Sequence, residues 1–237
     1  MQQLPENSVD MIFADPPYFL SNGGISCQNG QMVSVNKAEW DKSKGLKADF
    51  QFTNEWIKEA KRILKENGTI WISGTMHNIY QVGFALQLNN FKLLNEISWF
   101  KPNAPPNLSC KYFAHAHETI IWARKNAKIP HFFNYEVMKQ WNDKIASEGK
   151  QMRSVWSIPF TPKEEKIQGR HPTQKPMELL KRIISASTEE GAVILDPFNG
   201  SGTTGVVAKM LNRQYIGIDQ EKEFLQLTER RLKNQSI

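Results

Sequence analysis

Short apolar runs alternate with longer helical patterns along this chain, and this alternation constrains its fold more than any other feature. Runs rich in β-branched or aromatic residues predict strands at 9–14, 69–73, 97–100, 119–123, 193–195 and 215–218. Apolar residues three or four apart predict helices at 56–64, 77–88, 177–187, 203–211 and 221–233, the first of which should stop at Asn67-Gly68. Strands that alternate with helices favour an α/β fold, in which helices cover a mostly parallel sheet.

Two long segments lack this periodicity. Residues 19–37 are rich in Gly, Ser, Asn and Gln, and residues 126–169 show no sustained pattern. Loops of this length are uncommon in compact domains and are usually functional. We therefore predict a mobile substrate loop at 19–37 and an inserted target-recognition segment at 126–169. Both belong to a single domain over 1–237, because no clean linker divides the chain.

Positive charge is concentrated in the middle of the chain. The net charge is +6, but residues 101–175 alone hold 13 Lys and Arg against 6 Asp and Glu. Aromatic residues are interleaved with these basic ones, a pattern typical of a surface that binds a polyanion and stacks on its bases. An ordinary basic face over an aromatic core would give the same pattern, so charge alone leaves both interpretations open.

The motif Asp15-Pro16-Pro17-Tyr18 directly follows the first predicted strand. In open α/β sheets ligands bind outside the carboxyl ends of strands, so this turn is well placed for a site. Two prolines fix the backbone and remove two N–H donors, which leaves hydrogen-bond acceptors beside an aromatic ring. Such a turn suits a planar group with an NH2, whose hydrogens the acceptors take while Tyr18 stacks on its face. A rigid stop after the strand is the simpler interpretation.

A second predicted strand leads into a glycine-rich turn, Gly200-Ser201-Gly202-Thr203-Thr204-Gly205, with Asp219 placed 19 residues after the first glycine. This spacing fits a nucleotide-binding turn whose acidic partner holds ribose hydroxyls, although the glycines could simply allow close packing. In dinucleotide-binding turns the strand runs straight into the first glycine, whereas Asp196-Pro197-Phe198-Asn199 intervenes here. A cofactor without a pyrophosphate suits this turn better, and S-adenosylmethionine fits that description.

Together the two motifs resemble those of the β-type DNA amino-methyltransferases, in which the catalytic Asp-Pro-Pro-Tyr precedes the cofactor motif. The resemblance covers nearly the whole chain and includes Trp40-Asp41-Lys42, His117-Glu118-Thr119 and His171-Pro172-Thr173-Gln174-Lys175-Pro176. It is greatest to the smaller second adenine methyltransferases of GATC-type restriction systems. It implies a Rossmann-like, S-adenosylmethionine-dependent methyltransferase fold, with a mixed, mostly parallel sheet in circularly permuted order.

The resemblance further implies methyl transfer to the exocyclic N6 of an adenine that is flipped out of a duplex or single-stranded. The catalytic residues would be Asp15, Pro16, Pro17 and Tyr18. The cofactor would be bound by Asp15, His171, Thr173, Gln174, Lys175, Asp196, Phe198, Gly200, Ser201, Gly202, Thr203, Thr204 and Asp219. The alternatives are methylation of cytosine N4 and a catalytically weak DNA-binding subunit.

The implied partners are DNA, either double- or single-stranded, and a restriction endonuclease or second methyltransferase of the same system. DNA contacts are expected from Lys111, Arg124, Lys125, Lys128, Lys139, Lys144 and Arg153. The protein would act as a monomer or a homodimer. We expect no metal, because the reaction does not use one. We also expect a cytoplasmic protein, because the sequence shows neither a membrane-spanning stretch nor a signal-like start.

Family members usually carry one more strand before the Asp-Pro-Pro-Tyr strand, whereas Asp15 lies close to Met1 here. We therefore expect strand 9–14 to lack a neighbour on one side. A chain extended upstream by about 20 to 30 residues should bind S-adenosylmethionine about 5- to 150-fold more tightly, because the added strand covers the adenine of the cofactor. Calorimetric titration of both chains measures this difference, and equal affinities would contradict it.

Overall fold

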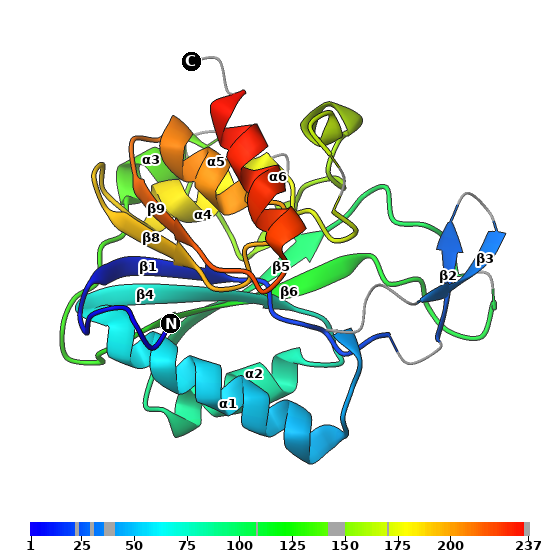
Figure 1. The fold of residues 1–237 in the computed structure, drawn as a ribbon, viewed down its shortest axis with the longest axis horizontal. Helices are drawn as coiled ribbons and strands as arrows, with labels where there is room; N and C mark the ends of the chain where they lie inside the picture. The colour runs from blue at the N-terminus through cyan, green and yellow to red at the C-terminus, as the bar shows by residue number, and fades with distance from the viewer. Residues whose placement is uncertain are drawn as a thin grey trace.

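The computed structural model describes residues 1–21, 24–28, 31–35, 41–107, 109–141, 150–169 and 171–234. Its centre is a seven-stranded sheet in the order β7-β5-β6-β4-β1-β8-β9 (Figure 1). The strands are β1 (Val9–Ala14), β4 (Leu64–Gly74), β5 (Lys92–Phe100), β6 (His117–Arg124), β7 (Val155–Ser157), β8 (Val193–Asp196) and β9 (Gln214–Gly217). All neighbours run parallel except β6, which is antiparallel to both β4 and β5. The predicted mixed, mostly parallel sheet is confirmed.

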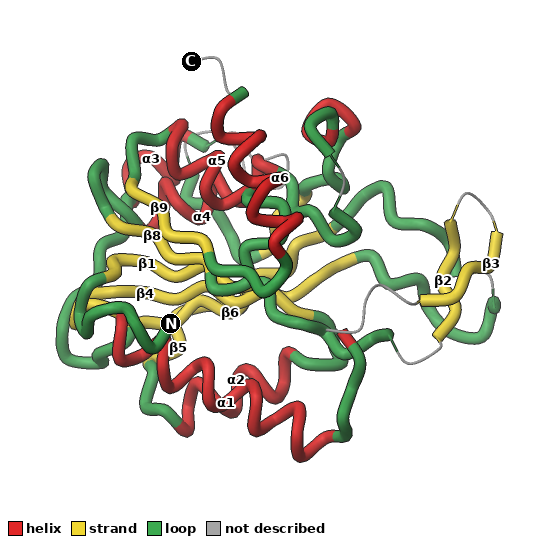
Figure 2. The backbone as a smooth tube through the Cα atoms, viewed as in Figure 1, coloured by secondary structure: helices red, strands yellow, loops and turns green. Residues whose placement is uncertain are grey.

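Helices cover both faces of this sheet, as Figure 2 shows. One face carries α1 (Leu46–Ile63) and α2 (Ile79–Leu88), and the other carries α3 (Tyr135–Gln140), α4 (Met177–Ser187), α5 (Thr203–Met210) and α6 (Lys222–Lys233). Successive strand residues point to opposite faces, so Ile12 packs into the α1 side and Phe13 into the α4 side. Among the described helices, none is long and apolar enough to cross a membrane.

The two segments predicted to be irregular contain short elements. Within 19–37, β2 (Gly24–Gln28) and β3 (Gln31–Val35) form an antiparallel hairpin that stands apart from the main sheet (Figure 1). Segment 126–169 contains α3, β7 and a 3-10 turn at Lys163–Lys166, and β7 extends the main sheet by pairing with β5. Elements of three to six residues are too short for a periodic pattern to reveal them.

The first helix ends earlier than the sequence predicted. α1 stops at Ile63 and β4 begins at Leu64, so Asn67-Gly68 lies within the strand. A Cβ at Gly68 would lie 2.9 Å from the Lys65 carbonyl oxygen and 3.1 Å from that of Asp10. The pairing of β1 with β4 shifts register at this point. The glycine therefore serves a close backbone approach in the sheet and does not end the helix.

Strand β1 lies in the interior of the sheet, so the expectation that it lacks a neighbour was wrong. It pairs with β4 on one side and with β8 on the other, and in the described sheet the edges are β7 and β9. Chain order did not reveal this because β8 comes from the C-terminal part of the chain. Ile12 pairs with Leu195, which brings the two Asp-Pro turns after β1 and β8 side by side.

Candidate active site

Polar side chains from four neighbouring strands lie together at the end of the sheet where β1 has its carboxyl terminus. Asp15 follows β1, Ser73 lies in β4, Glu118 lies in β6 and Lys101 follows β5. These strands are adjacent in the order β5-β6-β4-β1, which brings the four residues together from distant parts of the sequence. The carboxyl end of β1 thus carries a cluster of polar side chains, at the position where open α/β folds bind ligands.

The Asp15 carboxylate accepts hydrogen bonds on both of its oxygens. Its Oδ1 accepts from the hydroxyls of Tyr18 at 2.7 Å and Ser73 at 2.5 Å, and its Oδ2 accepts from the Lys175 ammonium at 2.5 Å. Burial alone would raise its pKa, but the Lys175 charge and these hydrogen bonds hold the pKa of Asp15 below its usual range. Asp15 is therefore an ionised acceptor at neutral pH.

Glu118 and two lysines complete this buried cluster. Lys101 donates to Oε1 of Glu118, while the Tyr18 hydroxyl lies 3.0 Å and the Lys175 Nζ 3.7 Å from Oε2. Burial opposes the charge, but Lys175 and Lys101 hold the pKa of Glu118 below its usual range. Burial likewise opposes the charge of Lys175, whose pKa is raised by Asp15 and Glu118. Sequence reasoning assigned no role to Ser73, Lys101 or Glu118, and only the His-Glu-Thr motif drew attention to one of them.

Tyr18 lies inside this cluster, with only 7% of its surface exposed. Lys175 Nζ lies 5.3 Å from the centre of its ring, over one face. The backbone N–H groups of Tyr18 and Phe19 both donate to Oδ1 of the buried Asp41 at 2.9 Å, and Leu20 donates to its other oxygen. Asp41 thus shapes the chain after Asp-Pro-Pro-Tyr. A base could stack on Tyr18 only after a neighbouring group moves, so the stacking role remains a prediction.

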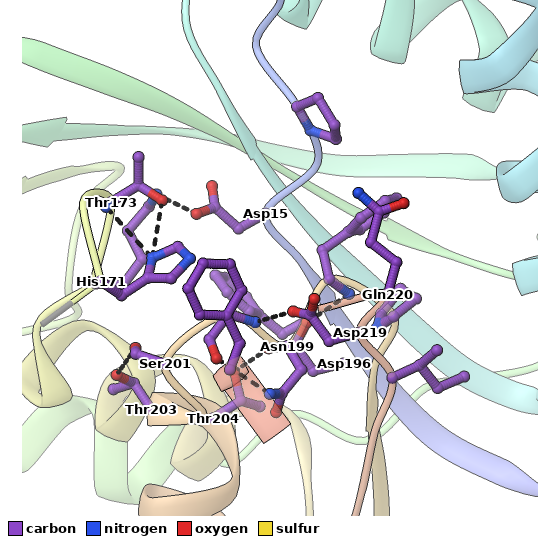
Figure 3. Close-up of a pocket in the computed structure, with 18 of the residues that line it drawn as sticks. Asp15, His171, Thr173, Asp196, Asn199, Ser201, Thr203, Thr204, Asp219 and Gln220 are labelled. Atoms are coloured by element: carbon purple, nitrogen blue, oxygen red, sulfur yellow. Dashed lines mark hydrogen bonds and ion pairs between the residues drawn. The ribbon is translucent and has the colours of Figure 1, made fainter. Parts of the chain in front are cut away.

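A cavity of about 450 Å³ opens between the ends of β1 and β8 (Figure 3). Most of the predicted cofactor-binding residues line it, namely Asp15, His171, Thr173, Lys175, Asp196, Phe198, Gly200, Ser201, Thr203, Thr204 and Asp219. Gln174 and Gly202 do not line it. Its size is that of a pocket for a cofactor-sized molecule.

The glycines of the glycine-rich turn serve both of the roles that the sequence left open, ligand binding and close packing. Gly200 has φ +49° and lines the cavity, where a Cβ would lie 3.1 Å from the His171 ring. Gly202 has φ +71°, and a Cβ there would overlap the side chain of Thr228. Gly205 packs in the same way against Tyr215. The first glycine thus faces the candidate ligand, whereas the other two allow close packing.

Two acidic residues flank this turn. Asp219 accepts from the Gly200 N–H at 2.7 Å, so it shapes the turn whether or not it also holds a ribose. Asp196 accepts from the Thr204 hydroxyl at 2.6 Å and from the Phe198 N–H at 3.0 Å. Burial raises the pKa of Asp196 to about 7, so its charge changes near neutral pH.

The residues of the hexapeptide that begins at His171 contact different parts of the structure. Lys175 faces Asp15 and Glu118, so it belongs to the catalytic cluster as well as to the cavity. Gln174 donates to the Glu165 carbonyl at 2.8 Å and so holds the 3-10 turn. Thr173 does not cap the following helix, because α4 begins at Met177 and its first N–H donates to the Glu165 carboxylate at 2.9 Å.

Two aromatic residues that the sequence did not single out, Phe52 and Phe224, line the cavity together with the predicted Phe198. Phe198 packs edge-on against Trp56 with ring centres 5.3 Å apart, and against Phe52 at 6.2 Å. Phe52, Phe198 and Ile218 all line the cavity, as does Phe224 beside His171. The cavity is thus lined by both apolar and acidic side chains.

The predicted DNA-binding residues lie in different parts of the molecule. Arg124 donates to the carbonyls of Ala127 and Ile129, and Lys125 donates to that of Leu64. These two residues and the following Lys128 lie at the amino end of β1, away from Asp15, because β6 runs antiparallel to β4. This placement on the side away from the active site does not favour DNA contact, and the role of these three residues stays a prediction.

The other four basic residues have different surroundings. Lys111 is exposed in the β5–β6 connection, whose base is closed beside the active site by the hydrogen bond from the Lys101 N–H to the Ala116 carbonyl. Lys139 pairs with Glu136 on α3 at 3.4 Å, and Arg153 is exposed just before β7. Lys144 lies outside the described residues. Trp99, Trp122 and Trp156 belong to the core, whereas Tyr112 and Phe113 are exposed next to Lys111.

The fold and the cavity define a Rossmann-like enzyme that joins a catalytic Asp-Pro-Pro-Tyr turn to a cofactor turn, the class that the resemblance predicted. The family model for N6/N4 DNA methylases matches residues 9–230. The chain therefore belongs to the DNA methylase family and is an S-adenosylmethionine-dependent DNA methyltransferase. Within the described part of the chain, no group of three His, Cys, Asp or Glu side chains could hold a metal ion.

Relatives and solved structures agree with this assignment. The type II methyltransferase M2.DpnII of Streptococcus pneumoniae is 58% identical over 233 residues, which cover 98% of this chain and 85% of the relative. M2.MboI of Moraxella bovis is 56% identical over 231 residues, or 98% of this chain and 83% of the relative. The crystal structure of the M1.HpyAVI–SAM complex is 28% identical, with a TM-score of 0.69 over 98% of this chain and 90% of that one. The cytosine-N4-specific PvuII methyltransferase, at 19% identity and a TM-score of 0.74 over 100% and 83% of the two chains, shares the fold.

Proposed function

We propose that this protein transfers a methyl group from S-adenosylmethionine to the exocyclic N6 of an adenine in DNA. The observation that carries the proposal is the ionised Asp15 carboxylate, which lines the same cavity as the glycine-rich turn at Gly200. Asp at the head of Asp-Pro-Pro-Tyr favours adenine by resemblance. Cytosine N4 is the second candidate because its amino group has the same chemistry.

The cavity suits S-adenosylmethionine in both of its parts. Phe198, Phe52 and Ile218 offer an apolar wall for a purine, while Asp196 offers negative charge for a sulfonium or an ammonium group. When bound, this cofactor supplies an electrophilic methyl group. The residues drawn in Figure 3 would hold it, with Asp219 and the Gly200 turn on the ribose side.

Asp15 would act on the target amine rather than deprotonate it in advance. The amine lone pair is delocalised into the base, and a carboxylate whose pKa lies below its usual range is too weak a base to remove the proton first. Asp15 and the neighbouring Pro16 carbonyl would accept the amine hydrogens and stabilise the positive charge that develops on the nitrogen. Lys175 keeps Asp15 ionised for this task.

Transfer of tritiated methyl groups to DNA, followed by base analysis, tests the proposal. We expect the label in N6-methyladenine. Label only in 4-methylcytosine would overturn the adenine assignment, and label absent from DNA of any sequence would support a weak DNA-binding subunit. The same assay on duplex and single-stranded DNA measures the strand preference. We also keep as a proposal that the protein works beside a restriction endonuclease or a second methyltransferase.

Cofactor binding should depend on pH through Asp196. Below its pKa of about 7 this carboxyl is neutral and does not attract a cation, and above it the carboxylate does. The dissociation constant for S-adenosylmethionine should therefore fall about tenfold between about pH 6 and about pH 8, as calorimetric titration measures. The Asp196→Asn variant should lose this dependence. If the variant keeps it, a group other than Asp196 is responsible.

DNA affinity should depend on Lys111 more than on Lys128. Lys111 lies in the β5–β6 connection beside the active site, and its neighbour Phe113 is 96% exposed, which suits stacking on a base. Lys111→Glu should weaken DNA binding and reduce the slope of log affinity against log salt by about 1. Lys128→Glu, an equal charge change at the opposite edge, is the matched control, and equal losses would contradict this assignment.

A further inference from the structure

The hydroxyl of Tyr18 lies between two carboxylates. Its oxygen is 2.7 Å from Oδ1 of Asp15 and 3.0 Å from Oε2 of Glu118. Burial first, and then both carboxylates, hold the pKa of Tyr18 far above its usual value, so the phenol keeps its proton. A phenol has one proton and can donate it to only one of these two acceptors at a time.

Asp15 is crowded before any substrate arrives. Its Oδ1 already accepts from Tyr18 and Ser73, and its Oδ2 accepts from Lys175. A carboxylate has about four lone-pair sites, so three are occupied. Both sites of Oδ1 are filled by the two hydroxyls, so an amine hydrogen can bind to Oδ1 only when one of these donors leaves. A buried donor that leaves needs another acceptor, because an unsatisfied buried hydroxyl is unfavourable.

Glu118 is placed to be that acceptor. It projects from β6 into the cluster, its side chain is 14% exposed, and Lys101 holds its other oxygen. Neither the Asp-Pro-Pro-Tyr turn nor the cofactor turn accounts for this residue. Asp15 and Glu118 are matched by Lys101 and Lys175, so both buried carboxylates can stay ionised.

We propose that Glu118 is a positioning residue for methyl transfer, which accepts the hydrogen bond of the Tyr18 hydroxyl in place of Asp15 and so frees Oδ1 of Asp15 for the target amine. The proposal rests on the proposed function only in requiring an exocyclic amine as substrate, and not in which base carries it. The hydrogen bond from Tyr18 to Asp15 breaks and one to Glu118 forms, while the proton stays on the phenol oxygen. Lys175, within reach of both carboxylates, keeps them in place during the exchange.

Glu118→Gln separates this role from a merely structural one. An amide has one acceptor oxygen, and Lys101 would claim it, so the NH2 would face Tyr18 and could not accept its proton. We expect kcat to fall about 10- to 100-fold, with the KM for DNA and the dissociation constant for S-adenosylmethionine within about threefold of wild type. Glu66→Gln, which alters another lysine-paired glutamate at the opposite edge, is the matched control and should keep wild-type activity.

A double-mutant cycle with Tyr18→Phe gives the decisive measurement. Without the hydroxyl there is no proton to place, so Glu118→Gln should cost less than about threefold in kcat in the Tyr18→Phe background. The same loss in both backgrounds would overturn the proposal, since Glu118 would then act through the lysines alone. A cofactor affinity lowered more than about tenfold in Glu118→Gln would overturn it as well, in favour of a structural role.

The rate in this cycle is total methyl incorporation into DNA, whichever base receives it. Base analysis of the same product reports separately on the proposed adenine specificity. Label in cytosine with the wild-type enzyme would therefore overturn the adenine assignment and leave the cycle fully interpretable. Label in adenine without coupling between Glu118 and Tyr18 would overturn the Glu118 proposal and leave the adenine assignment intact.

Discussion

Asp15→Asn should lower kcat by about 10³-fold, the largest effect expected from one substitution in this protein. An amide has a single acceptor oxygen and no charge, so it can neither balance Lys175 nor stabilise the positive charge that develops on the amine. Losing a charged acceptor in a site that excludes water costs about 4 kcal/mol of transition-state stabilisation. Affinities for DNA and for S-adenosylmethionine should stay within about threefold, because Asp15 acts mainly on the transition state.

Asn is the informative replacement because Ala would leave Lys175, Ser73 and Tyr18 without their shared acceptor. Asp10→Asn is the matched control, since Asp10 lies at the opposite end of β1 from Asp15 and pairs with Lys65. Single-turnover methyl transfer measures the rate, and calorimetric titration measures both affinities. Loss of cofactor binding together with the rate would assign Asp15 to the cofactor pocket instead of the chemistry.

Gly202→Ala should destabilise the fold by about 2 to 4 kcal/mol and lower the melting temperature by about 4 to 16 °C. Its φ of +71° already disfavours any side chain, and the added Cβ would overlap Thr228 on α6. Because Gly202 directly precedes α5, relief of the overlap would displace the turn that lines the cavity. Cofactor affinity should therefore fall along with the melting temperature.

Gly191→Ala separates the two causes. Gly191 has a similar φ, +78°, but nothing lies within 4 Å of its added Cβ. The Gly191→Ala variant should lose only about 1 kcal/mol of folding stability to backbone strain, which lowers its melting temperature by about 2 to 4 °C. Its cofactor affinity should stay unchanged. Equal losses in thermal melts of the two variants would show that the close approach to Thr228 is unimportant.

The chemistry-bearing turns were predictable from local sequence alone. A strand that ends in Asp15-Pro16-Pro17-Tyr18 and another that ends before Gly200 must present their turns at the carboxyl edge of a parallel sheet. The cavity lined by both turns agrees with that reasoning. Helices with a sustained apolar period, such as α4, were predicted to the residue because the period extends over several turns.

Short elements and long-range partners were not predictable in this way. The β2–β3 hairpin and β7 are too short for a period to show, and β7 is stabilised by pairing with β5. The charges of Arg124 and Lys125 made them candidate DNA contacts in the sequence. Because β6 runs antiparallel to β4, however, they lie at the end of the sheet opposite Asp15. Charge identifies a class of partner, whereas position on the surface depends on strand order.

By itself, then, the sequence determined the family, the parallel core and the two turns that bear the chemistry, because each depends on residues adjacent in the chain. Only the tertiary structure decided that β8 lies beside β1 and that Lys175 faces Asp15 across 160 residues. It also decided that Glu118 shares the Tyr18 hydroxyl. These contacts depend on which strands are neighbours and on how charges are balanced when they are buried, and neither leaves a local pattern in the sequence.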